Sequence, residues 1–164
     1  MELTRLPPPA PISGWWLDGP GDSVTLFHGS DALKIESIAS NGLLLHSDRC
    51  FLTPCYQTAT NYTIFGPAGG DFSVMKGKAP LYLYPLWRYA VAHFHISKDF
   101  IEEHGTFHEP GTGPLTRLKR KLSARSIYDQ SGEPDHLYYL WSEIVFRVPV
   151  PPEYFSGYSL PYCQ

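Results

Sequence analysis

The sequence predicts a single α+β domain built mainly from short strands. Its 164 residues suffice for one domain that buries most of its apolar surface without disulfide bonds. Hydrophobic residues make up 43% and charged residues 18% of the chain, as is typical of a globular protein. Aromatic residues, at 15%, and the sixteen prolines are numerous, and they favour short strands and irregular loops over long helices.

In the N-terminal half, apolar residues recur at helical spacing over residues 31–41, with polar residues before them and a glycine after them. This pattern predicts a helix whose N-cap is Ser30 or Asp31. A strand is expected just before the helix, at residues 24–27. His28 is therefore expected in the short turn that leaves this strand and enters the helix.

Two brief strands are expected next, at residues 43–45 and 50–53. Pro54 ends the second strand, because proline cannot donate a hydrogen bond to a strand ladder. Residues 55–64 can then form a helix that carries Tyr62 in its later turns.

The C-terminal half is expected to hold further strands at residues 81–84 and 90–96, the second with clear alternation of side-chain character. A short helix is expected near Phe100. The last strands are expected at residues 137–139 and 142–148, and the prolines that follow are expected to close the sheet.

Residues 1–22 are rich in proline and glycine, and we expect them to pack as a lead-in on the body of the domain, residues 23–164. Prolines interrupt the N-terminal segment, so no cleaved signal is expected, and no apolar run is long enough for a transmembrane helix. The chain is therefore expected in the cytoplasm without a membrane partner. Export without a cleaved signal would leave no trace in the sequence.

Cysteine content and charge give two further indications. Cys50, Cys55 and Cys163 cannot all pair with one another, and none has a zinc or redox spacing, which agrees with a reducing compartment. The formal net charge of -3 gives no electrostatic footprint for duplex nucleic acid, although residues 117–125 form a local basic run. A nucleic-acid partner is thus neither required nor excluded.

Three short segments carry residues suited to chemistry: His28 with Gly29, the aromatic stretch 51–62, and Glu143 at the head of an apolar strand. Taken together and in this order, they resemble the catalytic core of the ADP-ribosyltransferase superfamily. The resemblance is to the branch of the poly(ADP-ribose) polymerases and diphtheria-toxin-like enzymes, whose signature is a histidine, a tyrosine and a glutamate on three strands. Phe51 stands here in place of the usual strand tyrosine and offers a ring face without a hydroxyl.

The resemblance implies two small facing mixed β-sheets with short helices and a cleft for NAD between them. It implies transfer of ADP-ribose from NAD to an unidentified macromolecular or small-molecule acceptor, with release of nicotinamide. A small transferase of this kind would favour single transfer over polymerisation. It would suit a toxin or effector, which a cognate inhibitor protein can accompany.

Glu143 is the expected catalytic carboxylate. Cleavage of the bond between nicotinamide and ribose passes through a species with oxocarbenium character, which a nearby carboxylate stabilises. The resemblance gives Glu143 a hydrogen bond to the nicotinamide ribose and a role in orienting the nucleophile. Trp141, two residues earlier, is not the acid found in arginine-specific enzymes, which argues against arginine as the acceptor.

The resemblance also assigns the residues that would hold NAD. His28 would hydrogen-bond the adenosine ribose, and Gly29 would let the backbone approach the nicotinamide amide without a Cβ between them. Ser30 would add a hydroxyl contact or merely cap the next helix. Tyr62 would stack on the nicotinamide ring and join Glu143 and His28 in catalysis. The set is completed by Phe51, Thr53 and Ala59.

Two other interpretations remain open. The Phe51 substitution is compatible with an inactive module on the same fold that binds NAD or an ADP-ribosylated partner. The histidines in the middle of the chain suggest a metal-dependent enzyme instead, although their spacing lacks the glutamate of known zinc-protease motifs. The candidate ligands are His93, His95, His104 and His108.

Overall fold

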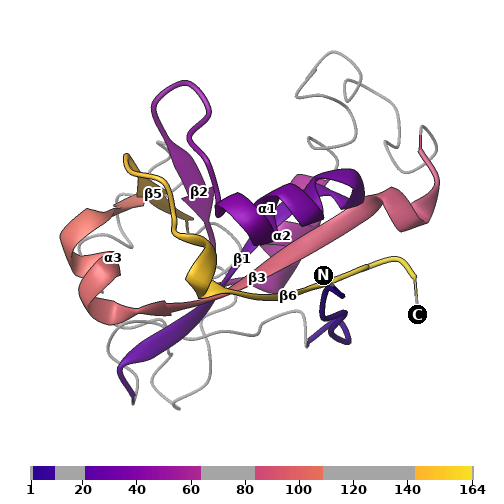
Figure 1. Ribbon diagram of the computed structural model, residues 1–164, viewed down its shortest axis with the longest axis horizontal. Coiled ribbons are helices and arrows are strands. Elements are labelled where there is room, and N and C mark those ends of the chain that lie inside the picture. Colours follow the sequence, from indigo (N-terminus) through magenta and orange to yellow (C-terminus); the bar gives the residue numbers. More distant parts are fainter. Residues whose placement is uncertain (1, 10–20, 64–83, 109–142, 164) are drawn as a thin grey trace, which may run out of the picture.

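Two small antiparallel sheets form the framework of the computed structural model, which describes residues 2–9, 21–63, 84–108 and 143–163 (Figure 1). Each sheet has three strands, and short helices connect and cover them. The fold is therefore of the α+β class, as the sequence predicts.

The first sheet contains β1 (Ser23–Asp31), β3 (Tyr89–Ser97) and β6 (Phe155–Ser159), with β3 in the centre. Strands β1 and β3 pair over nine residues without a register shift, from Ser23 opposite Ser97 to Asp31 opposite Tyr89. Strand β1 is thus a long edge strand whose position is set along its whole length.

The second sheet contains β2 (Cys50–Leu52), β5 (Glu143–Phe146) and β4 (Gly105–His108), with β5 in the centre. Strand β5 is buried along its whole length, and Glu143 is its first residue. Because β5 pairs with both neighbours, the backbone that carries Glu143 is held from two sides.

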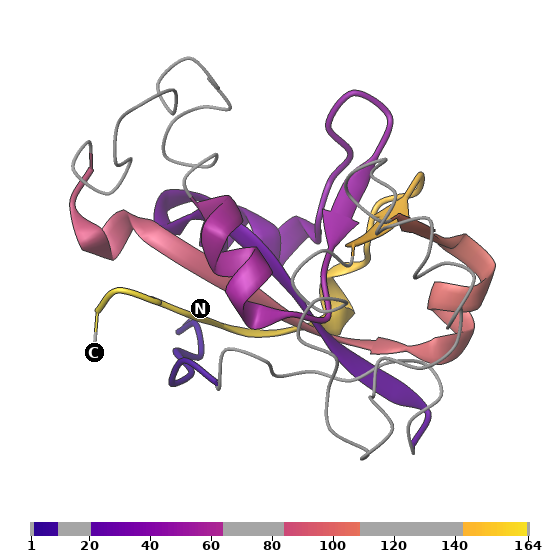
Figure 2. The same ribbon diagram turned by 180° about the vertical axis from the view of Figure 1, so that it is seen from behind.

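Helices α1 (Ile35–Asn41) and α2 (Tyr56–Tyr62) lie on opposite faces of the first sheet, as the front and back views show (Figures 1 and 2). Helix α3 (Lys98–His104) leads directly from β3 to β4 and so links the two sheets. Three single 3-10 turns complete the described elements: η1 (Ala32–Lys34), η5 (Leu86–Arg88) and η6 (Pro152–Tyr154).

Side chains of the first sheet alternate between two apolar clusters. The larger cluster, on the α1 face, includes Leu26 and Phe94, which are paired across the strands and fully buried. The smaller cluster, on the α2 face, consists of Phe27, Tyr56, Ala59 and Val91. Helix α2, which carries Tyr62, is therefore fixed to β1 by its own apolar contacts.

One backbone pair joins the two sheets. The amide of Phe27 in β1 donates to the carbonyl of Thr53 at 2.8 Å, and the amide of Thr53, just after β2, donates back to Phe27 at 2.9 Å. We call this reciprocal pair the seam. It brings the middle of β1 to the end of β2, beside the start of β5.

Several expected elements are confirmed. Residues 32–41 are helical, as the turn η1 followed by α1, and of the two expected caps it is Asp31 that accepts the amide of Leu33 at 3.0 Å. Helix α2, strand β3 and helix α3 also lie where the sequence predicts them.

Two expectations about the sheets are wrong. His28 lies inside β1 and not in a turn, because β1 stays paired with β3 as far as Asp31. The sheets are not mixed, since every pair of named strands is antiparallel; the single parallel contact in the described residues is an isolated bridge between Arg5 and Tyr158.

The strand expected at residues 43–45 and the role expected for the prolines after β5 also need correction. Residues 43–45 form no strand and make only an isolated bridge from Leu43 to Val150. The prolines after β5 do not close the first sheet, because the chain turns through η6 and returns as β6. The expected strands at 81–84 and 137–139 and the basic run 117–125 fall outside the described residues, except for Tyr84.

Gly29 is required by the packing of α2 on β1. A Cβ at this position would lie 2.7 Å from the amide nitrogen of Thr63 and closer still to the carbonyl oxygen of Ala59. These are backbone atoms, so they cannot rotate away. Helix α2 can therefore pack this closely on β1 only because Gly29 has no side chain.

We expect Gly29→Ala to lower the free energy of unfolding by about 3 kcal/mol, because overpacking of a well-filled site typically costs this much. Chemical denaturation followed by circular dichroism measures the change. The exposed Ser40→Ala on α1 is the control and should stay within about 0.5 kcal/mol of the parent. An equally small effect of Gly29→Ala would contradict the close packing.

Candidate functional site

His28 extends the seam with a side chain. Its Nδ1 lies 2.9 Å from the carbonyl oxygen of Phe51 in β2. A carbonyl oxygen can only accept, so Nδ1 carries the hydrogen. The structure thus joins two of the three predicted segments directly, through a contact that the sequence does not reveal.

The other ring nitrogen of His28 is then an acceptor. Burial lowers the pKa of His28, its hydrogen bond to Phe51 opposes this, and the positive charge of Lys34 lowers the pKa further. The imidazole is therefore neutral near pH 7, with a lone pair on Nε2. A half-buried acceptor of this kind suits a hydroxyl group as its partner.

The backbone of Gly29 faces the outer edge of β1. In an antiparallel pair, residues alternate between those that bond across the ladder and those that point away. Phe27 bonds outward to Thr53, so Gly29, two residues on in an unbroken register, also directs its N–H and C=O outward. Within the described residues, no hydrogen-bond partner of these two groups is found.

Tyr62 and Glu143 meet beside this edge. Burial raises the pKa of Tyr62, and a side-chain hydrogen bond to Glu143 and the charge of that carboxylate raise it further. The tyrosine hydroxyl therefore stays protonated and donates to the carboxylate. The backbone of Tyr62 also lies against Gly29, since its carbonyl carbon would be 2.8 Å from a Cβ there.

Strand register places Glu143 next to the seam. Leu52 pairs with Ile144, so the next positions along the two strands are Thr53 and Glu143. Glu143 is only 7% exposed, yet it lies at the point where both sheets and α2 converge. The candidate site is thus the group formed by His28, Gly29, Tyr62 and Glu143.

The remaining predicted site residues have mainly packing positions. Ser30 is buried in β1, and Ala59 is fully buried against Gly29. Thr53 is buried as well; its hydroxyl accepts the amide of Cys55 at 3.1 Å. Phe51 differs from them, because this residue is 37% exposed.

His93 belongs to a buried polar chain. Its Nε2 lies 2.8 Å from the hydroxyl of Ser159, which lies 2.7 Å from the hydroxyl of Tyr56. His95, two residues on, is exposed. Among the residues that the structure describes, no group of histidine, cysteine or acidic side chains is placed to hold a metal ion. The side chain of His108 is not described.

One ion pair that the sequence does not suggest secures the end of β1. Asp31 is buried and accepts from both Nε and Nη2 of Arg88. The Arg88 guanidinium also lies 4.7 Å from the centre of the Tyr84 ring, a cation–π contact. These contacts tie η5 to Asp31, which is the last residue of β1 and the N-cap of η1.

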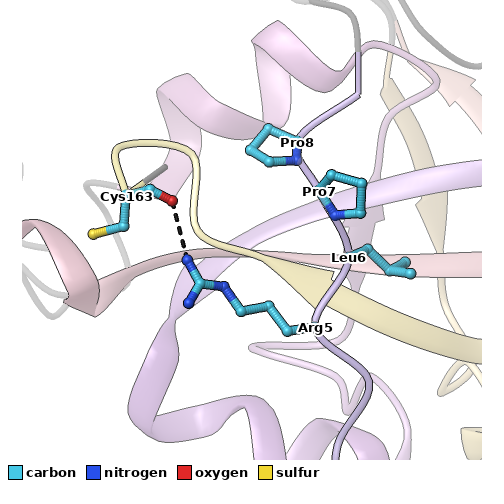
Figure 3. A pocket seen from close by; sticks show the side chains of 5 residues that line it. All are labelled: Arg5, Leu6, Pro7, Pro8 and Cys163. Carbon is cyan, nitrogen blue, oxygen red and sulfur yellow. Dashed lines mark hydrogen bonds between the residues drawn. The ribbon is translucent and has the colours of Figure 1, made fainter.

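A surface hollow elsewhere contains none of the predicted site residues (Figure 3). It lies where the N-terminal segment pairs with β6 through Tyr158, whose carbonyl accepts the amide of Leu6 at 2.7 Å. Arg5 crosses it and donates to the carbonyl of Cys163 at 3.0 Å. The hollow is lined by Arg5, Leu6, Pro7, Pro8 and Cys163.

Chemically, the candidate site combines a donor–acceptor edge with a carboxylate. The N–H and C=O of a single strand residue match the C=O and NH2 of a primary carboxamide, which can bind them as a neighbouring strand would. The Glu143 carboxylate can stabilise positive charge or accept a proton nearby.

Comparison with known proteins gives no relative for this chain: no protein-family model matches it, and neither do curated proteins or solved structures. In the described part of the chain, no helix is long and apolar enough to span a membrane.

The buried position of His93 predicts a pH dependence of stability. Burial lowers the pKa of His93 to about 4 from an ordinary value of 6.5. Between these two values the unfolded chain binds the proton and the folded chain does not, so stability falls as the pH falls. The loss from this group approaches about 3 kcal/mol near pH 4 and does not grow below it.

We expect denaturant titrations at several pH values to show this decline, and His93→Gln to reduce the slope between pH 6.5 and pH 4. His28, whose pKa is also lowered, contributes a slope in the same direction, which remains in this variant. An unchanged slope in His93→Gln would refute the assignment to His93.

Proposed function

We propose that this protein is an NAD-dependent ADP-ribosyltransferase that transfers single ADP-ribose units to an acceptor and releases nicotinamide. The observation that carries the proposal is the meeting of the outward-facing backbone of Gly29 with the Tyr62–Glu143 pair. A carboxamide recognition edge, an aromatic ring and a carboxylate are the parts that cleavage at nicotinamide requires.

In this proposal, Gly29 binds the carboxamide of nicotinamide through its N–H and C=O, and the ring of Tyr62 packs on the pyridine ring. Nε2 of His28 accepts a hydrogen bond from a ribose hydroxyl, in keeping with its neutral form. These contacts hold the bond between nicotinamide and ribose at Glu143.

Chemistry then follows from the charges. As the bond from ribose C1′ to the pyridinium nitrogen breaks, its electron pair passes to that nitrogen, and neutral nicotinamide leaves. The ribose gains oxocarbenium character, which the Glu143 carboxylate stabilises. A nucleophilic atom of the acceptor forms the new bond to C1′, and Glu143 accepts the proton that this atom loses.

Tyr62 has a second part in this scheme. Its hydroxyl donates to Glu143 and so fixes the orientation of the carboxylate. The absence of a hydroxyl at Phe51 is therefore no obstacle to the reaction, because a tyrosine hydroxyl reaches the carboxylate from α2.

The test is nicotinamide release from NAD by the purified protein, measured by chromatography with and without cell lysate. We expect Glu143→Gln to release nicotinamide at least about 100-fold more slowly, since it removes the charge opposite the developing cation. Tyr62→Phe should be about tenfold slower, because a hydrogen bond to a charged group contributes about 1.5–3 kcal/mol.

Tyr154→Phe is the matched control for Tyr62→Phe. It removes a hydroxyl that lies 3.1 Å from Ser97, in a contact that involves no candidate site residue, and should leave the rate unchanged. Wild-type release that does not depend on Glu143 would contradict the proposal. Absence of release under every condition, with NAD binding retained, would replace it with the inactive binding module.

A further inference from the structure

We propose that the acceptor is a single-stranded nucleic acid, bound by a strip of the second sheet that consists of Arg49, Phe51 and Arg147. The acceptor role rests on the proposed transferase function, whereas the binding itself can be tested without any activity. The strip begins at the candidate site and runs away from it along β2 and β5.

Strand geometry aligns the strip with Glu143. Phe51 pairs with Val145, so their side chains share one face of the sheet, and Glu143 lies on that face two residues from Val145. Arg49 precedes β2 and alternates onto the same face as Phe51. Successive residues on one face of a β-strand, such as Arg49 and Phe51, lie roughly 7 Å apart. This distance is similar to the spacing of successive phosphates in extended single-stranded nucleic acid.

The two arginines come together because β2 and β5 are antiparallel. Arg49 directly precedes β2 and Arg147 directly follows β5, and the carboxylate of Asp48 binds both. Arg147 Nη1 lies 2.8 Å from Asp48 Oδ2, and Arg49 Nε lies 3.2 Å from Asp48 Oδ1. The arginine side chains are 64% and 47% exposed.

Charge counting favours an anionic occupant. One carboxylate between two guanidinium groups leaves a net positive charge, and each guanidinium has further N–H donors that Asp48 does not occupy. Phosphate groups suit these donors, because arginine can bind them with two parallel hydrogen bonds.

The turn that presents these groups is strained. It closes with hydrogen bonds between His46 and Arg49 of 2.8 and 3.3 Å. Its two central residues, Ser47 and Asp48, have φ of 60° and 119°, which non-glycine residues rarely adopt. The loop between α1 and β2 stands out from the body in both views (Figures 1 and 2). Strain of this kind is often retained where a side chain must be held for function.

Phe51 distinguishes nucleic acid from an acidic protein. Its exposed ring lies between the arginines and the candidate site, where it can stack on an unpaired base. Acidic side chains would use the arginines but gain little from the ring. Duplex nucleic acid would not expose a base face to it, and the overall charge of -3 gives no broad basic surface for a duplex.

The test is fluorescence anisotropy with labelled, mixed-sequence single-stranded DNA and RNA of about twelve nucleotides, in about 50 to about 200 mM NaCl. We expect Phe51→Ala to weaken binding about tenfold, through loss of stacking, and Phe51→Trp to retain it. The double variant Arg49→Gln/Arg147→Gln should weaken binding and reduce the slope of log affinity against log salt concentration by about 1.4. Thermal unfolding checks that each variant is folded.

Arg5→Gln is the control, because it removes an arginine charge from the hollow near Cys163, away from the strip, and should not alter binding (Figure 3). The proposal would be overturned if the protein bound neither the DNA nor the RNA oligonucleotide. It would also be overturned if Arg5→Gln weakened binding as much as the double arginine variant does. Binding of polyglutamate that depends on the arginines but not on Phe51 would assign the strip to an acidic protein instead. A raised KM for NAD in the arginine variants, with oligonucleotide binding unchanged, would assign it to the donor.

Discussion

The seam between the two sheets is the contact on which the rest of the candidate site depends. The reciprocal backbone hydrogen bonds of Phe27 and Thr53 fix the position of β2 relative to β1. The hydrogen bond from His28 to the carbonyl of Phe51 adds a second attachment. Because β5 pairs with β2, the seam also fixes where Glu143 lies relative to β1. Neither sheet alone would bring a carboxylate to the outer edge of Gly29.

The same seam explains why the backbone N–H and C=O of Gly29 face the outer edge of β1. Phe27 forms its backbone hydrogen bonds on the side of β1 away from β3, and because hydrogen-bonding direction alternates along a strand, Gly29 faces the same side. Helix α2 fills the space that a side chain at Gly29 would occupy. Helix α2 then delivers Tyr62 to Glu143. In the proposed function, donor recognition and catalysis are thus consequences of how one edge strand is packed.

Local signals in the sequence predict part of this structure. The cap at Asp31, the helix that follows it and the alternation of β3 depend on neighbouring residues and were visible in the pattern. The local pattern predicts a turn at His28, but pairing with β3, more than sixty residues away, extends the strand past it. Strand β6 is not predicted because prolines precede it, and pairing with β3 overrides that local signal.

For the candidate site, the resemblance singles out Tyr62 and Glu143, but not their hydrogen bond. The two arginines around Asp48 belong to no recognisable motif.

The most direct test of this account is a nuclear magnetic resonance titration of the 15N-labelled protein with nicotinamide. We predict that the backbone amide of Gly29 shows the largest shift change, with smaller changes at Thr53, Tyr62 and Glu143. Changes confined to other surfaces, such as the hollow between Arg5 and Cys163, with Gly29 unaffected, would contradict it.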